Sequence, residues 1–141
     1  TKDIYLVDLN PTKGAEINKA RPCIIVSNDD VGVLPLKIVV PLIGYKEHHN
    51  KSWLVKIEPT KNTGLSKDST ADPMHIRSVS HDRILKKIGS IDDNTYSKLK
   101  EAIKIVLDLQ YVYYLLFNKL KHHFKLNKGE FTYSLYGFGV M

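Results

Sequence analysis

The first 28 residues of this 141-residue chain constrain its fold most strongly, because they hold two apolar runs joined by a short polar loop. Residues 3–9 set apolar side chains among polar neighbours, a pattern typical of a β-strand with one buried face. Residues 23–26 are apolar without interruption and mostly β-branched, as in a buried central strand. The loop between the two runs is centred on Gly14. The pattern therefore predicts a strand, a glycine-centred loop and a second strand.

Arg21 stands where this second strand begins, directly before Pro22. A proline fixes its own φ and pushes the preceding residue into extended geometry. We therefore expect the guanidinium of Arg21 to be held at a strand entrance beside the loop. A fixed cation in that position can meet a ligand.

The rest of the pattern predicts further short strands followed by a helix. Four more strands are expected at residues 36–42, 52–57, 74–79 and 84–88, with a loop over residues 59–68. Gly89 ends the sheet, and Asp92 and Asp93 supply N-cap chemistry for a helix whose apolar stripe includes Leu99 and Ile103. Six short strands with long polar connections favour a closed or nearly closed antiparallel barrel. The expected fold class is mostly β with an appended α-helix.

Length, charge and cysteine content narrow the class of protein. A chain of 141 residues is expected to form one domain. Its 21 Lys plus Arg exceed its 15 Asp plus Glu, and this positive balance favours a polyanion as partner. Cys23, the single cysteine, is expected to be a buried apolar residue and not a nucleophile. No signal sequence is recognised, and the apolar run at residues 111–117 is far shorter than the roughly 20 residues of a membrane span. These observations predict a cytoplasmic protein without a membrane partner.

Residues 111–141 differ in kind from the rest, because they hold nine of the chain's 13 aromatic residues. Their first part can prolong the helix to about Phe124, with a basic end. We therefore divide the chain into a barrel domain with its helix, residues 1–110, and an aromatic-rich extension, residues 111–141, that is helical at first. An extension that faces the core or a partner subunit is favoured over a platform for stacking RNA bases.

Several motifs in one order resemble the MazF/PemK (Kid) family of toxins from type II toxin-antitoxin systems. The resemblance is collinear from the first residues to about Leu109. The most specific part is the Asp-Leu-Asn-Pro-Thr-Lys-Gly loop followed by Arg-Pro. The matching segments are residues 3–14, Glu16, Arg21-Pro22, residues 25–29, Val39-Val40-Pro41, Gly64-Leu65, Asp68-Ser69, Ile76-Arg77-Ser78 and Lys87-Ile88-Gly89.

The resemblance implies a fold and an activity. The fold is an SH3-like barrel of the MazF/CcdB type with appended helices, assembled as a homodimer. The activity is cleavage of single-stranded RNA, such as mRNA, without a metal or other cofactor, and a cognate antitoxin protein masks the RNA groove. In the implied reaction the ribose 2′-hydroxyl attacks its own phosphorus, which leaves a 2′,3′-cyclic phosphate and a free 5′-hydroxyl.

Three residues are the candidates for catalysis. Arg21 matches the family arginine, and its forked donors suit the oxygens of a phosphorane, whereas a salt bridge at the strand entrance is the structural alternative. Glu16 occupies a family position in the loop, where it orients Arg21, takes part in proton transfer, or is simply a solvated carboxylate. His75 stands where the family commonly has a glutamine. Its imidazole either supplies an acid or base or fills that place and bonds to the barrel backbone.

Phosphate contacts around the groove are predicted for a second set of residues: Lys13, Gly14, Lys19, Lys46 and Arg77. No metal site is expected, because adjacent histidines such as His48 and His49 direct their side chains apart. The site has fewer polar side chains than is usual in the family, because Ile43, Ile17 and Met74 stand where the family usually has polar residues. The loss of one preorganised hydroxyl at Ile43 costs about 100- to 1,000-fold by analogy with oxyanion sites. A catalytically weak or inactive protein that binds antitoxin or RNA without cutting is therefore the alternative function.

Overall fold

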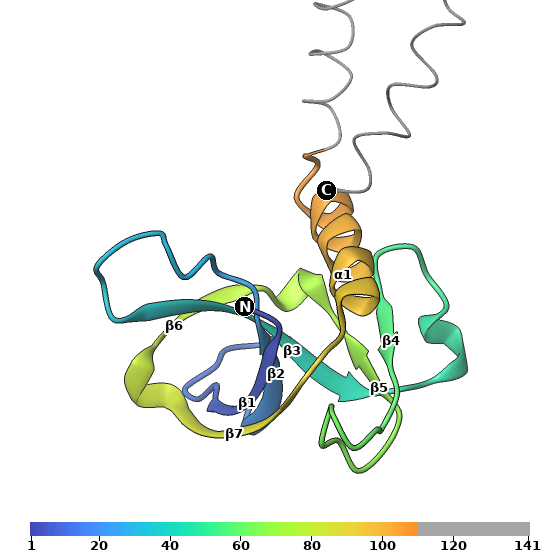
Figure 1. Ribbon diagram of the computed structural model, residues 1–141, viewed down its shortest axis with the longest axis horizontal. Coiled ribbons are helices and arrows are strands. Elements are labelled where there is room, and N and C mark those ends of the chain that lie inside the picture. The colour runs from blue at the N-terminus through green and yellow to red at the C-terminus, as the bar shows by residue number, and fades with distance from the viewer. Residues whose placement is uncertain (110–141) are drawn as a thin grey trace, which may run out of the picture. The chain divides into compact units, whose positions relative to one another are not determined.

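Seven β-strands and one α-helix make up the part of the chain that the computed structural model describes, residues 1–109. Residues Thr1–Leu107 form one unit, shown in Figure 1. The strands are β1 (Asp3–Asp8), β2 (Ala20–Ile25), β3 (Leu36–Gly44), β4 (Val55–Ile57), β5 (Ser69–Ala71), β6 (Arg77–Ser80) and β7 (Ile84–Ser90), and the helix is α1 (Asp93–Val106). Three 3₁₀ turns lie between them: η1 (Glu47–His49), η2 (Pro73–His75) and η3 (His81–Arg83).

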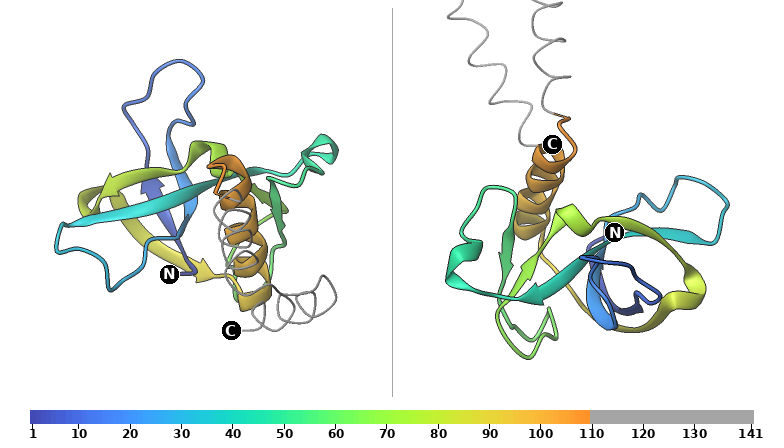
Figure 2. Two further views of the ribbon diagram at one scale, coloured as in Figure 1. Left: turned by 90° about the horizontal axis from the view of Figure 1, so that it is seen from above. Right: turned by 180° about the vertical axis from the view of Figure 1, so that it is seen from behind.

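The strands pair only in the antiparallel sense, in the order β4-β5-β3-β2-β1-β7, and β6 pairs with β3. The long strand β3 is shared along its length: residues 36–39 pair with β6, 39–41 with β2 and 42–44 with β5. The series β6-β3-β2-β1-β7 curls into a ring, and the η3 turn leads directly from β6 into β7 (Figures 1 and 2). The predicted antiparallel barrel with a following helix is therefore confirmed.

Two apolar clusters fill the two sides of this sheet. One lies inside the ring and consists of Val7, Leu9, Cys23, Ile25, Val39 and Val79. The other lies between the sheet and α1 and includes Ile4, Ile24, Val40, Leu42, Leu99 and Ala102. Because successive strand residues point to opposite faces, β1, β2 and β3 contribute to both clusters, and each fully buried aliphatic side chain contributes about 1.5–3 kcal/mol. Burial on both faces explains why the second apolar run is continuous in sequence.

Helix α1 begins at the predicted N-cap. The Asp92 carboxylate accepts a hydrogen bond from the backbone N–H of Thr95 at 2.6 Å. The helix ends at Val106, and Asp108 adopts a left-handed φ of 54°. The sequence allows the helix to continue without a break to about Phe124. This prediction is wrong for residues 107–109, which lie beyond the end of α1. The predicted extension at 111–141 lies outside the described residues.

Three of the strand predictions need correction. The expected strand at 52–57 is confined to β4, and Trp53 precedes it with a partly exposed side chain. The expected strand at 74–79 is divided, because Pro73–His75 form the η2 turn and β6 starts only at Arg77. Asp72 caps that turn and Pro73 lacks the N–H that a strand would use, so extended pairing cannot continue through them. Strand β5 was not predicted, and β7 continues past Gly89 to Ser90.

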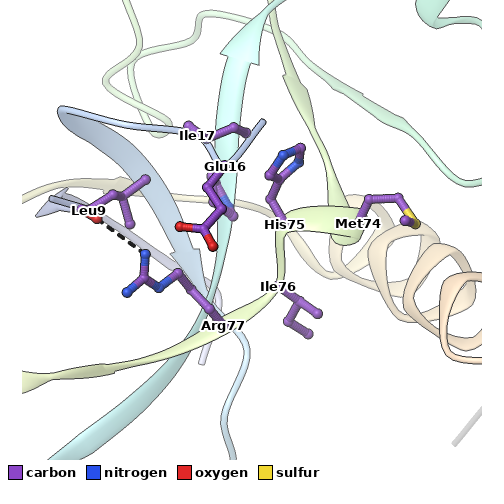
Figure 3. Close-up of a pocket in the computed structure, with 8 residues that line it drawn as sticks. Leu9, Glu16, Ile17, Met74, His75, Ile76 and Arg77 are labelled. Atoms are coloured by element: carbon purple, nitrogen blue, oxygen red, sulfur yellow. Dashed lines mark hydrogen bonds between the residues drawn. The ribbon is translucent and has the colours of Figure 1, made fainter. Parts of the chain in front are cut away.

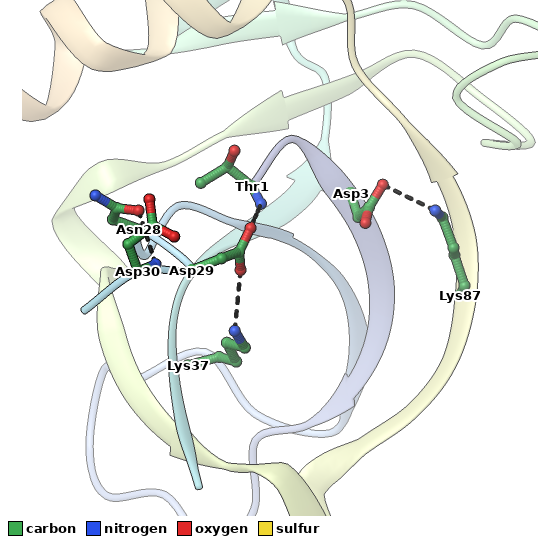
Figure 4. Close-up of polar contacts among 7 residues, drawn as sticks. All are labelled: Thr1, Asp3, Asn28, Asp29, Asp30, Lys37 and Lys87. Carbon is green, nitrogen blue, oxygen red and sulfur yellow. Dashed lines mark hydrogen bonds and ion pairs between the residues drawn. The ribbon is translucent and has the colours of Figure 1, made fainter. Parts of the chain in front are cut away.

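The end of the ring where β1 begins carries ion pairs. Asp29 accepts from the Lys37 ammonium at 3.0 Å and from the amino group of Thr1 at 2.9 Å, and Lys87 pairs with Asp3 at 2.9 Å (Figure 4). The other end, where β1 ends, carries the loop from Leu9 to Lys19. Charged groups at the first end thus neutralise one another, while the loop end is organised differently. Across the described residues, no helix combines the length and apolar character that crossing a membrane requires.

Candidate active site

A cavity of about 260 Å³ opens at the loop end of the ring. It lies between the loop of residues 9–19, β3, the η2 turn and the start of β6 (Figure 3). The lining residues are Leu9, Glu16, Ile17, Pro41, Met74, His75, Ile76 and Arg77. Three of them carry ionisable side chains that the sequence had singled out: Glu16, His75 and Arg77. The cavity therefore brings together a carboxylate, an imidazole and a guanidinium from segments about 60 residues apart in sequence.

Strand register explains why two arginines leave the sheet at this end. Arg21 on β2 lies opposite Val7, and Arg77 on β6 lies opposite Val39. Residues directly opposite on paired strands share a face, and both valines belong to the cluster inside the ring. Arg21 and Arg77 therefore project from the inner face of the ring, next to the loop.

Cys23 lies two residues after Arg21 on the same face of β2, and it is fully buried, as predicted. Burial raises the pKa of the Cys23 thiol to about 12, and the charges of Arg77 and Arg21 oppose that rise. The positive fields of both guanidiniums thus reach the same sulfur atom. Cys23 is a buried apolar residue beneath a pair of cations and not a nucleophile.

All three arginines of the chain donate to main-chain carbonyls of one segment, residues 8–18. The Arg21 Nε donates to Asn18 O at 2.9 Å, and the Arg77 Nη1 donates to Leu9 O at 3.2 Å. The Arg83 Nη1 donates to the carbonyls of Asp8 and Asn10. Within the described residues, none of the three forms an ion pair with a carboxylate. A neutral carbonyl fixes a guanidinium in place without cancelling its charge, so this end of the ring stays electropositive.

Glu16 is held at the tip of the same loop. Its Oε2 accepts from the backbone N–H of Lys13 at 2.9 Å, and its own N–H donates to Lys13 O at 3.3 Å. Gly14 sits within this turn at a φ of 59°, in the left-handed region that favours glycine. The Glu16 carboxylate and the Arg77 guanidinium point toward one another across the cavity (Figure 3).

His75 has an acceptor at each ring nitrogen. Its Nδ1 lies 3.1 Å from the Oδ2 of Asp72, and its Nε2 lies 3.3 Å from the carbonyl oxygen of Ala15. Carboxylate and carbonyl oxygens only accept hydrogen bonds, so both contacts are hydrogen bonds together only when the imidazole carries both protons. His75 thus connects the η2 turn to the loop through both ring nitrogens.

The other residues predicted for the site lie outside the cavity lining. Lys13, Gly14 and Lys19 are exposed on the loop that forms one wall, and Arg21 lies at the base of that loop. Lys46 follows β3 on a different segment, before η1, and does not contribute to the cavity. Of the three substituted positions, Ile17 and Met74 line the cavity, whereas Ile43 pairs with Thr70 of β5. Within residues 1–109, no group of three or more His, Cys, Asp or Glu side chains is placed to hold a metal ion.

Asp72 is the polar residue at this site that sequence reasoning missed. Its carboxylate caps the η2 turn through the N–H of Met74 at 3.0 Å and also contacts His75. The sequence carried a signal for it, because Asp72-Pro73 combines an N-cap residue with a proline at the first helical position.

Fold and cavity together define a small antiparallel barrel protein whose cavity combines a guanidinium, a carboxylate and an imidazole. Residues 1–107 match the family described as PemK-like, MazF-like toxin of type II toxin-antitoxin system. The chain is 33% identical over 119 residues to endoribonuclease MazF9 of Mycobacterium tuberculosis, with 76% of this chain and 94% of that protein covered. It is 31% identical over 109 residues to endoribonuclease EndoA of Bacillus subtilis, with 76% and 92% covered.

Solved structures share the fold. MazF from Deinococcus radiodurans superimposes with a TM-score of 0.64 at 17% identity, covering 77% of this chain and 94% of that one. An endoribonuclease from a mycobacterial species, solved in complex with its cognate antitoxin, gives a TM-score of 0.61 at 20% identity, with 77% and 93% covered. The chain belongs to the PemK-like, MazF-like toxin family. The predicted class, a toxin of the endoribonuclease type, is confirmed at the level of this family, and substrate and chemistry are taken up below.

Proposed function

We propose that the protein cleaves single-stranded RNA in the cytoplasm, at the cavity lined by Glu16, His75 and Arg77. One observation carries the proposal: all three arginines are held by carbonyls of one loop, next to a carboxylate and an imidazole, with no carboxylate paired to any of them within the described residues. Such a site suits a polyanion, because its positive charge is available to phosphate.

The proposed chemistry is a transesterification that requires no metal ion. Glu16 accepts the proton of the ribose 2′-hydroxyl while the bond from O2′ to phosphorus forms. The bond from phosphorus to O5′ then breaks, and His75 gives its Nε2 proton to O5′, which leaves a 2′,3′-cyclic phosphate and a 5′-hydroxyl. A positioned acid or base contributes roughly 100- to 10,000-fold each.

Arg77 is the proposed partner of the phosphorane oxygens, because it is the arginine that lines the cavity. Its Nη1 is engaged by Leu9 O, and its other donors have no partner within the described residues. Arg21 is tied to Asn18 at the base of the loop, where its terminal nitrogens can meet a neighbouring phosphate. Lys13 and Lys19 lie on the loop, and Lys46 lies further away. These three lysines extend the proposed contact surface along the RNA. These assignments move the principal cation from Arg21 to Arg77.

Partners are proposed on family grounds together with an exposed apolar segment. We propose a homodimer and a cognate antitoxin, since a structural neighbour is an endoribonuclease solved with its antitoxin. Val31, Val33 and Leu34, in the connection between β2 and β3, are largely exposed. Grouped apolar side chains on a surface mark contacts with other proteins, so this segment is the proposed contact with a second copy.

The test is a gel assay of end-labelled single-stranded RNA in the presence of EDTA. We expect cleavage products that end in a cyclic phosphate, and loss of cleavage in Arg77→Gln. Lys61→Gln, which removes one positive charge from the exposed loop between β4 and β5, is the matched control and should cleave normally. Intact RNA with the unmodified chain, combined with tight binding of the antitoxin, would instead support the alternative of a binding protein that does not cut.

A further inference from the structure

We propose that Asp72 is a positioning residue for the reaction, one that holds the His75 imidazole in the orientation and protonation state of a proton donor. This inference rests on the proposed function, because it gives His75 the acid role in RNA cleavage. It concerns a residue of the η2 turn that does not line the cavity and acts only through its neighbour.

The Asp72 carboxylate is fixed before it meets the imidazole. One oxygen, Oδ1, accepts from the backbone N–H of Met74 at 3.0 Å, and the backbone N–H of Asp72 donates to Pro41 O on β3 at 3.1 Å. The remaining oxygen, Oδ2, faces His75 Nδ1 at 3.1 Å. The Asp72 side chain is only 14% exposed, so water competes little for this contact. The carboxylate is therefore a rigid acceptor aimed at one ring nitrogen.

Local geometry places the side chains of Asp72 and His75 beside each other. A 3₁₀ turn has three residues per turn, so side chains at positions i and i+3 lie one above the other. Asp72 is the N-cap of η2 and His75 is its third residue, which places them in that relation. Met74 lies between them in the turn, and both Met74 and His75 line the cavity (Figure 3).

The consequence is a defined route for one proton. The carboxylate keeps the proton on Nδ1, so the proton that can leave is the one on Nε2, which rests on Ala15 O in the absence of substrate. In the reaction, O5′ of the leaving nucleotide replaces that carbonyl and receives the Nε2 proton as its bond to phosphorus breaks. The imidazole becomes neutral with Nδ1–H still bonded to Asp72, and a proton from water restores it. A carboxylate that holds the distal nitrogen of a catalytic histidine works by the same logic in hydrolases.

The charged groups around His75 come from three segments. Asp72 lies on its own turn, Glu16 reaches the cavity from the loop, and Arg77 reaches it from β6. Helix α1 packs against the η2 turn but adds no charged side chain to the cavity lining. Glu16 and Asp72 bring negative charge to the imidazole, and Arg77 brings positive charge. Of these groups, Asp72 is the one whose carboxylate lies at hydrogen-bond distance from a ring nitrogen.

The experiment compares Asp72→Asn with Asp82→Asn in the full chain. The asparagine side chain in Asp72→Asn keeps an amide oxygen that can cap Met74, while the negative charge facing His75 is lost. We expect kcat for RNA cleavage to fall 10- to 100-fold with KM little changed, and the shape of the pH–rate profile to change. Asp82 is exposed on the neighbouring η3 turn, and its substitution removes the same charge, so it should leave kcat and the profile unchanged.

A double-mutant cycle with His75→Gln separates positioning from a structural role. If Asp72 acts through His75, Asp72→Asn has no further effect on kcat in the His75→Gln background. An equal loss in both backgrounds, or an unchanged pH profile in Asp72→Asn, would overturn the inference while RNA cleavage by the unmodified chain remained established. An unmodified chain that does not cleave RNA would overturn the proposed function itself, and the role of Asp72 with it.

Discussion

Substitution of Gly89 by alanine tests how closely the loop between β4 and β5 packs on β7. A Cβ at this position would lie 2.3 Å from Asn62 O and 2.4 Å from Thr63 O, so the loop backbone must retreat by about 1 Å to reach ordinary contact. Asn62 O also accepts from the Ser90 N–H at 2.9 Å, and this hydrogen bond would be strained or lost. Such overpacking destabilises the folded chain by roughly 1–3 kcal/mol, and loss of the hydrogen bond does so by roughly 0.5–1.5 kcal/mol. Alanine also restricts the unfolded chain, which favours the folded state by roughly 0.4–1 kcal/mol.

We therefore expect Gly89→Ala to lower the free energy of unfolding by about 2–3 kcal/mol, or Tm by roughly 10 °C. The measurement is urea unfolding followed by circular dichroism, with midpoints compared at equal m-value. Gly44→Ala is the matched control, because Gly44 also lies in a strand and a Cβ there would meet only the flexible end of Lys67 at 3.6 Å. Its effect should stay within about 0.5 kcal/mol. Equal stability of the two variants would refute the packing argument.

Four further predictions concern Cys23, Asp92 and the segment between β2 and β3. Burial raises the pKa of Cys23 to about 12, so at pH 8 the folded chain should react with a thiol reagent at least about 1,000-fold more slowly than the unfolded chain. Because the thiol of the unfolded chain ionises at lower pH than the folded one, the free energy of unfolding should fall from about pH 8.5 upward. This fall should be smaller in Cys23→Ala. The hydrogen bond from the Thr95 N–H lowers the pKa of Asp92, so Asp92→Ala should lower Tm at neutral pH. The difference in Tm should vanish as acid protonates the native carboxylate, and a difference that stays constant with pH would contradict the N-cap. Val33→Ser with Leu34→Ser should shift the proposed homodimer to monomer in light scattering, and an unchanged dimer mass would exclude this segment as the proposed contact.

The parts of the fold that the sequence predicted are those whose burial follows a local period. Strands β1, β2, β3 and β7 and helix α1 each present apolar side chains to one or both clusters at the spacing of their own secondary structure. The start of α1 was also predicted, because Asp92 signals an N-cap through its own side chain. Local chemistry was sufficient in these cases.

Strand β5 could not be predicted in the same way. Its residues Ser69, Thr70 and Ala71 are small or polar, and they are buried only because β3 and β4 pair on either side of them. The predicted strand at residues 74–79 is wrong for a different reason. The apolar side chains of Met74 and Ile76 favour a strand in sequence, whereas Asp72-Pro73 specifies a turn. Nothing in a three-residue polar strand distinguishes it from a loop until its partners are known.

The sequence names candidate residues for the site but does not predict how they are arranged. Pro22 pointed to Arg21 as the fixed cation, whereas the cavity is lined by Arg77. The position of Arg77 depends on its register opposite Val39, a pairing between residues 38 apart that no local pattern reports. His75 and Glu16 were found because they stand at motif positions, but their common cavity depends on the same long-range pairing.

The way in which the arginines are held is the structural feature that most supports the proposed anionic substrate. A structural arginine is usually satisfied by a carboxylate, which fixes the guanidinium and neutralises it together. Here Arg21, Arg77 and Arg83 are fixed by carbonyls of residues 8–18, and the His75 ring contacts a carbonyl of the same loop. Position and charge are thereby separated: the loop supplies the geometry and leaves the positive charge for a ligand. Since the same loop carries Glu16, any movement of it displaces the cations and the carboxylate together, so a protein that covered this loop would block the proposed phosphate binding and the proposed proton transfer in a single step.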